Sequence, residues 1–151
     1  MPLLPRVALA LLVIATTVSA NLTDGLVGQW TFSEGGGDTV EDISGAANHG
    51  VFDGNPSWAP GWDGDGAEFD GASEVVVADA DSLWLDTGVT IAVWAMPADG
   101  QASWAKFLIK QKSVEYPYSL QFDDTQGIFG TVNADARFDT TPHLPNFVDE
   151  W

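Results

Sequence analysis

Apolar residues along this chain come in short runs that Gly, Pro, Asn and Asp interrupt. After the first twenty residues, no segment repeats apolar residues at helical spacing, and several alternate with polar residues as strands do. The run LVGQWTF, for example, would place Leu26, Trp30 and Phe32 on one face of a strand. The pattern predicts at least seven strands, at residues 26–32, 67–69, 74–77, 90–96, 107–109, 118–122 and 128–132.

One of these predicted strands, TIAVWAM at residues 90–96, is apolar on both faces. A strand with this pattern is typical of the centre of a sheet that is covered on both sides. Pro97 would end it, because proline has no N–H to donate to a ladder. Alternation in the strands further predicts that Trp30, Trp94 and Phe122 are core residues. Short strands at this spacing indicate an all-β antiparallel sandwich or barrel.

The first twenty residues differ from the rest. MPLLPR carries a positive charge, a twelve-residue apolar run follows, and Val18-Ser19-Ala20 offers small residues for cleavage. This arrangement predicts a signal peptide at residues 1–20, because the apolar run is too short for a spanning helix. The remaining 131 residues (151 − 20), residues 21–151, suffice for one domain. We therefore expect a secreted protein, extracellular, periplasmic or at the cell surface, with no membrane insertion after cleavage.

The net charge of the chain limits which kinds of partner it can bind. Loss of Arg6 leaves 4 basic residues (5 − 1) against 22 acidic ones, a formal charge of −18. Nucleic acid and anionic lipid would be repelled, so neither is an expected partner. Six of the aspartates precede Gly, which favours tight turns between strands. The chain has no Cys and thus no disulfide, so its stability depends on its core, on a bound metal, or on both.

The segment EDISGAANHG, residues 41–50, combines oxygen-bearing side chains with turn residues. Glu41, Asp42, Ser44 and Asn48 supply carboxylate, hydroxyl and amide oxygens, and the glycines permit carbonyls to turn inward. Calcium takes six to eight such oxygens. A plain Asx turn at Asp42 explains the same residues. The residues alone leave both interpretations open.

Other candidate sites fail on spacing. Asp63-Gly64-Asp65 resembles the start of an EF-hand loop, but Ala67 and Glu68 occupy positions that need an oxygen ligand and a Gly. Sandwich glucanases carry three acids on one strand, and Glu68 with Asp70 resembles part of that pattern. The Gly71-Ala72 break places Glu74 across a hairpin. His49 and His143 have no evident Ser partner, so we expect no catalytic residues.

Four tryptophans lie in or beside predicted loops: Trp58, Trp62, Trp84 and Trp104. Trp84 stands between Leu83 and Leu85, so it would point outward if those two point inward. An exposed indole among acids and amides suits stacking on a sugar ring. Trp84, Trp62 and Trp104 are therefore the predicted ligand-binding residues. The alternative is that loop tryptophans cover the ends of the sandwich.

The order of these motifs resembles the laminin G-like, concanavalin A-like jelly-roll modules of secreted proteins. The resemblance rests on LVGQWTFSEGGGDTVEDISGAANHGVF, on Trp58, on GAEFDGASEVVVAD, on TIAVWAMP and on KFLIKQKSVEYPYSLQF, and it covers residues 21–151. It implies two packed antiparallel sheets, a non-catalytic role in binding carbohydrate or a cell-surface ligand, and a structural calcium at Asp42. The family pattern continues past Trp151 to a closing acidic strand, so the resemblance implies an incomplete sandwich here.

Two further functional classes are compatible with this resemblance. The chain could be an accessory module or an incomplete fragment of a secreted glycoside hydrolase with the same fold. It could also be an adhesion domain without a sugar site.

Overall fold

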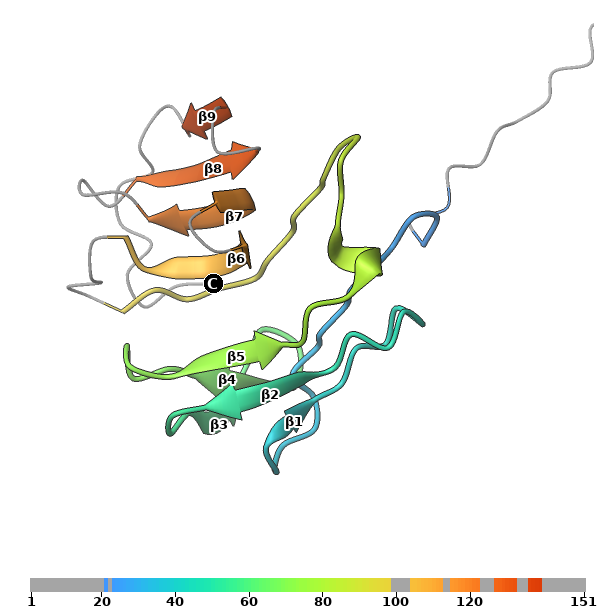
Figure 1. The fold of residues 1–151 in the computed structure, drawn as a ribbon. Coiled ribbons are helices and arrows are strands. Elements are labelled where there is room, and N and C mark those ends of the chain that lie inside the picture. The colour runs from blue at the N-terminus through green and yellow to red at the C-terminus, as the bar shows by residue number, and fades with distance from the viewer. Residues whose placement is uncertain are drawn as a thin grey trace, which may run out of the picture.

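The structure, a computed structural model, describes residues 21, 23–98, 104–112, 115–122, 127–132 and 136–139. Within these ranges the secondary structure consists of nine β-strands and one 3₁₀ turn. Every paired strand is antiparallel, and the strands form three sheets (Figure 1). The predicted all-β class is confirmed. The predicted signal peptide and His143 lie outside the described residues.

The first sheet has the order β1-β2-β5, formed by Thr39–Val40, Gly50–Asp53 and Glu74–Val77. A separate hairpin joins β3 (Ser57–Pro60) to β4 (Asp65–Glu68). In Figure 1 this hairpin lies behind β2 and β5, and ring contacts connect the two layers. Phe52 meets Trp58 edge-on at 5.3 Å and Phe69 at 6.1 Å between ring centroids.

The second half of the described chain is a four-stranded meander. Its strands are β6 (Lys106–Lys112), β7 (Glu115–Phe122), β8 (Ile128–Val132) and β9 (Ala136–Asp139), paired in sequence order. Tyr118, Phe122 and Phe129 are buried in it. The ring of Phe107 lies 4.7 Å from that of Phe122. The predicted core role of Phe122 is thus confirmed.

A short 3₁₀ turn, η1 (Asp81–Leu83), connects the two halves. The hydroxyl of Tyr118 on β7 donates to the Leu83 carbonyl at 3.0 Å, a buried hydrogen bond. On its other side η1 is tied to the segment 41–50, because the Asn48 amide donates to the Ser82 hydroxyl at 2.9 Å. The sheet β6–β9 is therefore held to the first half through η1.

Several strand predictions are confirmed. Residues 74–77 and 128–132 match β5 and β8 residue for residue, and residues 107–109 and 118–122 lie within β6 and β7. Residues 67–69 overlap the end of β4. The sequence pattern missed β1, β2, β3 and β9, which are four residues long or shorter.

Two strand predictions are wrong. Residues 90–96 form no strand with any described residue, and Trp94, predicted to be core, is 70% exposed. An apolar run becomes a central strand only where other strands pair with it and cover it, and no described strand does so here. Residues 26–32 form only an isolated bridge, between Trp30 and Asp42, and Trp30 is half-buried.

No helix in the described part of the chain is long and apolar enough to cross a membrane.

Candidate functional site

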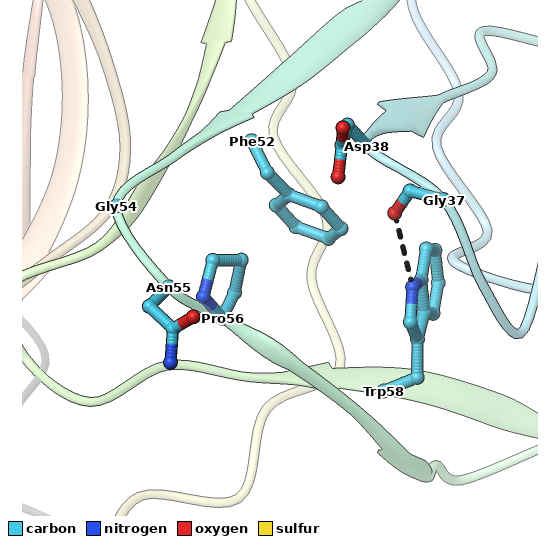
Figure 2. Close-up of a pocket in the computed structure, with 7 residues that line it drawn as sticks. All are labelled: Gly37, Asp38, Phe52, Gly54, Asn55, Pro56 and Trp58. Carbon is cyan, nitrogen blue, oxygen red and sulfur yellow. Dashed lines mark hydrogen bonds between the residues drawn. The ribbon is translucent and has the colours of Figure 1, made fainter.

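A hollow of about 310 Å³ lies beside the β2–β3 connection. Figure 2 shows its lining, which comes from the chain before β1, the end of β2, the turn that follows and the start of β3. The lining residues are Gly37, Asp38, Phe52, Gly54, Asn55, Pro56 and Trp58. Its volume is at the lower end of the range for ligand sites.

The turn that shapes this hollow requires glycine. Gly54 follows Asp53 with φ of +90°, in the left-handed region that glycine adopts at little cost. A Cβ on Gly54 would also lie 2.8 Å from the Ser73 Cβ. The Asp-Gly pair therefore reverses the chain and lets it approach the β4–β5 connection closely, as the Asp-Gly pattern predicts.

The aromatic wall of the hollow is fixed in place. The indole N–H of Trp58 donates to the Gly37 carbonyl at 3.2 Å, drawn as the dashed line in Figure 2. The Phe52 ring meets the indole edge-on at an interplanar angle of 73°. Both contacts hold the Trp58 ring in one orientation, so little side-chain freedom remains to be lost when a ligand binds.

Polar groups accompany these rings. Figure 2 shows the Asp38 carboxylate and the Asn55 amide on either side of the Phe52 ring. Both residues are exposed, whereas Phe52 and Trp58 are half-buried. The surface that lines the hollow is more polar than apolar, and the two rings belong to its apolar part. The sequence analysis noted Trp58 as a loop tryptophan but did not find this site, although the neighbouring Asn55-Pro56 was a usable signal.

The segment 41–50 centres on the buried carboxylate of Asp42. Its Oδ1 accepts the backbone N–H groups of Gln29 and Ser44, both at 2.8 Å. Its Oδ2 accepts the N–H of Asn48 and the hydroxyl of Ser44, both at 2.9 Å. Partial burial acts to raise the pKa of Asp42, but the hydrogen bonds from Ser44, Gln29 and Asn48 together hold this pKa below its ordinary value.

Asn48 extends this network. Its side-chain amide donates to the Val27 carbonyl at 2.7 Å and to the Ser82 hydroxyl at 2.9 Å. Its backbone carbonyl accepts the indole N–H of Trp30 at 2.8 Å. The ring of His49 also takes part, since its Nδ1 accepts the Asp42 N–H at 3.1 Å. The segment is thus bound to residues before β1 and to η1.

This arrangement does not fit a calcium ion. Both oxygens of Asp42 face N–H and O–H donors, which present positive hydrogen atoms where a cation would need to lie. Glu41 is exposed, and its N–H donates to Glu34 Oε1. Among the residues that the structure describes, no three His, Asp or Glu side chains group in a way that could hold a metal. The contacts at Asp42 are those of the Asx-turn alternative.

Trp84, the first predicted binding residue, lies beside the sheet β6–β9. The ammonium groups of Lys110 and Lys112 lie over its ring, 4.6 and 4.8 Å from the centroid. Lys110 also forms an ion pair with Asp79. The hydrogen bond from Lys110, with further help from Trp84, lowers the pKa of Asp79 against partial desolvation. Trp84 therefore takes part in the contact between the two halves of the chain.

The other two predicted binding residues lie elsewhere. Trp62, in the β3–β4 turn, stacks on Trp94 with 5.0 Å between ring centroids and an interplanar angle of 2°. Trp104 meets the Phe129 ring edge-on at 5.6 Å. None of the three predicted tryptophans lines the hollow at Trp58.

The three acids weighed as a glucanase motif are separated. Glu68 is the last residue of β4, and its carboxylate accepts the Ser57 hydroxyl at 3.5 Å. Asp70 lies in the following turn, where its Oδ1 accepts the Ala72 N–H at 2.9 Å. Glu74 begins β5 in another sheet. These acids do not share a strand, so the one-strand glucanase pattern is not reproduced here.

Comparison of the chain with protein-family models, with curated proteins and with solved structures gives no match.

Proposed function

We propose that this chain is a non-catalytic carbohydrate-binding module and that the hollow at Trp58 is its sugar site. One observation carries the proposal: a half-buried indole, held by its own hydrogen bond, faces a hollow with a carboxylate and an amide at its edge. Sugar rings present apolar C–H faces and a rim of hydroxyls. The ring of Trp58 suits the first, and Asp38 and Asn55 suit the second.

The charge of the site indicates which sugars it takes. Asp38 is the charged residue of the lining, and residues 21–98 contain no Lys or Arg. A uronic acid or a sulfated sugar would meet only carboxylates in this part of the chain, without a cation to pair with it. The proposed ligand is therefore a neutral glycan.

The finer fold and the location belong to the same proposal. The three antiparallel sheets and the order of motifs from LVGQWTF to YSLQF support a laminin G-like jelly roll. The apolar run before Val18-Ser19-Ala20 supports export with cleavage after Ala20. In this proposal the module acts outside the cell. Calcium, expected from the sequence, is not required for the sugar site.

Affinity electrophoresis through gels that contain neutral polysaccharides tests the sugar site. We expect the wild-type chain to be retarded by at least one of them, and Trp58→Ala to lower its affinity about tenfold or more, equivalent to about 1.4 kcal/mol. Trp62→Ala is the matched control, because it removes an exposed indole that does not line the hollow. The proposed site would be contradicted if Trp62→Ala lost its retardation while Trp58→Ala kept the retardation of the wild type. Release of new reducing ends would instead support the hydrolase alternative.

A further inference from the structure

Residues 88–98 have no regular secondary structure, although they are the most apolar stretch of the described chain. Figure 1 shows them in the long extended loop between η1 and β6. No backbone hydrogen bond connects residues 90–96 to any other described residue. With respect to the described residues, the backbone N–H and C=O groups along this segment are unpaired, as on the open edge of a sheet.

Three large side chains of this segment are exposed, whereas Ile91 and Ala95 are half-buried. Val93 is 50% exposed, and Met96 is 44% exposed. Trp94 has one described aromatic partner, Trp62, which is itself exposed. This stack attaches the middle of the segment to the β3–β4 turn and leaves Val93 and Met96 exposed. Exposed apolar side chains gathered in one stretch are typical of an interaction site.

The composition of the segment favours a strand. Residues 89–96, VTIAVWAM, contain β-branched and aromatic residues but no charge, Gly or Pro. Short segments of this kind have the highest tendency to pair with another strand. The segment therefore has the side chains of a central strand, and no strand among the described residues pairs with its backbone.

Charge decides which strand fits. A second copy of this chain would bring the same net charge of −17, so the two would repel each other. Residues 21–98 contain no Lys or Arg, so this half of the chain attracts cationic partners. A strand that carries Lys or Arg on one face and apolar residues on the other would complement both the charge and the uncovered side chains.

We propose that residues 90–96 are an acceptor for an added β-strand, supplied by a separate polypeptide that alternates apolar with basic residues. The added strand would pair with the N–H and C=O groups of this segment in a ladder. Its apolar side chains would lie on one face of the new sheet, next to Val93 on that face or next to Trp94 and Met96 on the other. This site is independent of the hollow at Trp58, and neither proposal requires the other.

Amide hydrogen exchange of the full chain tests this proposal, with the synthetic peptide KVTVKVTVK as probe. We expect the peptide to slow exchange at residues 90–96 by about tenfold or more, because ladder hydrogen bonds protect amides. The scrambled peptide KKKVVVVTT, of equal charge, should give no protection. Val93→Pro should abolish the effect, because proline cannot donate to the ladder. Val93→Thr, which keeps a strand-forming residue, should retain it, with unchanged melting temperatures for both variants.

Three results would overturn the proposal. Protection of residues 90–96 without peptide, independent of protein concentration, would show that the chain itself already covers them. Protection that grows with protein concentration would identify a second copy as the occupant. Equal protection by the scrambled peptide would show that charge alone attracts it.

Discussion

Trp58 and Trp84 illustrate how the same residue type serves two purposes within one acidic half of the chain. Both are half-buried. In the sequence, each stands in or beside a predicted loop. Trp84 has two lysine ammonium groups over its ring, whereas Trp58 donates to Gly37 and faces a hollow. The partners that arrive from distant strands decide whether an indole is left facing a hollow or joins parts of the protein.

The origin of those partners explains the difference. Lys106, Lys110, Lys112 and Arg137, the basic residues of the described chain, all lie on strands of the sheet β6–β9. Trp84 follows η1, next to this sheet, and so receives cations. Trp58 lies on β3 and receives none. The contact at Trp84 thus joins an acidic half to the half that carries the cations.

The largest expected effect removes the carboxylate that helps tie the segment 41–50 to η1, beside Trp84. Asp42→Ala would leave the N–H groups of Gln29, Ser44 and Asn48 without their acceptor, and would loosen the connection through Ser82 to η1. Unpaired buried groups each cost about 1–3 kcal/mol, so we expect a loss of about 3 kcal/mol or more. Thermal unfolding should show a melting temperature lower by roughly 10 °C. Asp63→Ala, in an exposed turn, is the control and should change it little.

A second prediction separates the two tryptophans. Trp84→Ala removes two cation–π contacts and a half-buried ring, so we expect a loss of about 2 kcal/mol in unfolding free energy. Retention on neutral polysaccharide should stay at the wild-type level once the protein is folded. If Trp84→Ala instead weakens retention while the melting temperature stays constant, Trp84 is the binding residue, as the sequence analysis predicted.

A smaller effect is expected on the stability of the fold at low pH. The folded-state pKa values of Asp42 and Asp79 lie below their ordinary values. Their contributions are therefore present above the unfolded pKa of about 3.9 and are lost as pH falls through the folded values. Melting temperature should fall steeply below about pH 4, and less steeply in Asp42→Asn. Lys110→Met should remove only the Asp79 part, which is small because that carboxylate is exposed. Identical pH profiles for the wild type and Asp42→Asn would contradict this account.

The smallest effect is expected from calcium. If calcium bound at Asp42, a hundredfold excess over its dissociation constant would stabilise the fold by about 2.7 kcal/mol. The hydrogen bonds at Asp42 lead us to expect equal melting temperatures in calcium and in chelator. A rise of several degrees in calcium, absent in Asp42→Ala and poorly reproduced by magnesium, would show that the turn rearranges around the ion as the resemblance implies.

Features that follow from residue type and local pattern were predictable. The strands at residues 74–77 and 128–132 follow from alternation and neighbouring turns, and both are confirmed. The turn at Asp42 was one of two stated alternatives, and its partners Ser44 and Asn48 lie within six residues. Short-range chemistry of this kind is readable from residue type and spacing alone.

Features that need distant partners were not predictable. The hollow forms because the β3–β4 hairpin lies against β2, which brings Gly37 to Trp58 across twenty-one residues. The sequence predicted an outward-pointing Trp84, but the lysines over its ring come from more than twenty residues away. Residues 90–96 have the pattern of a central strand, but a strand also needs a neighbour, and no described strand lies beside this segment.

Titration of the isotope-labelled chain with neutral oligosaccharides, followed by NMR, tests the central claim most directly. The indole N–H signal of Trp58 and the side-chain amide of Asn55 should shift in a saturable way, because both groups belong to the hollow. The indole signal of Trp84 should stay in place. Shifts confined to Trp84, Trp62 or Trp104, or no shift at Trp58 with any neutral oligosaccharide, would contradict a sugar site at Trp58.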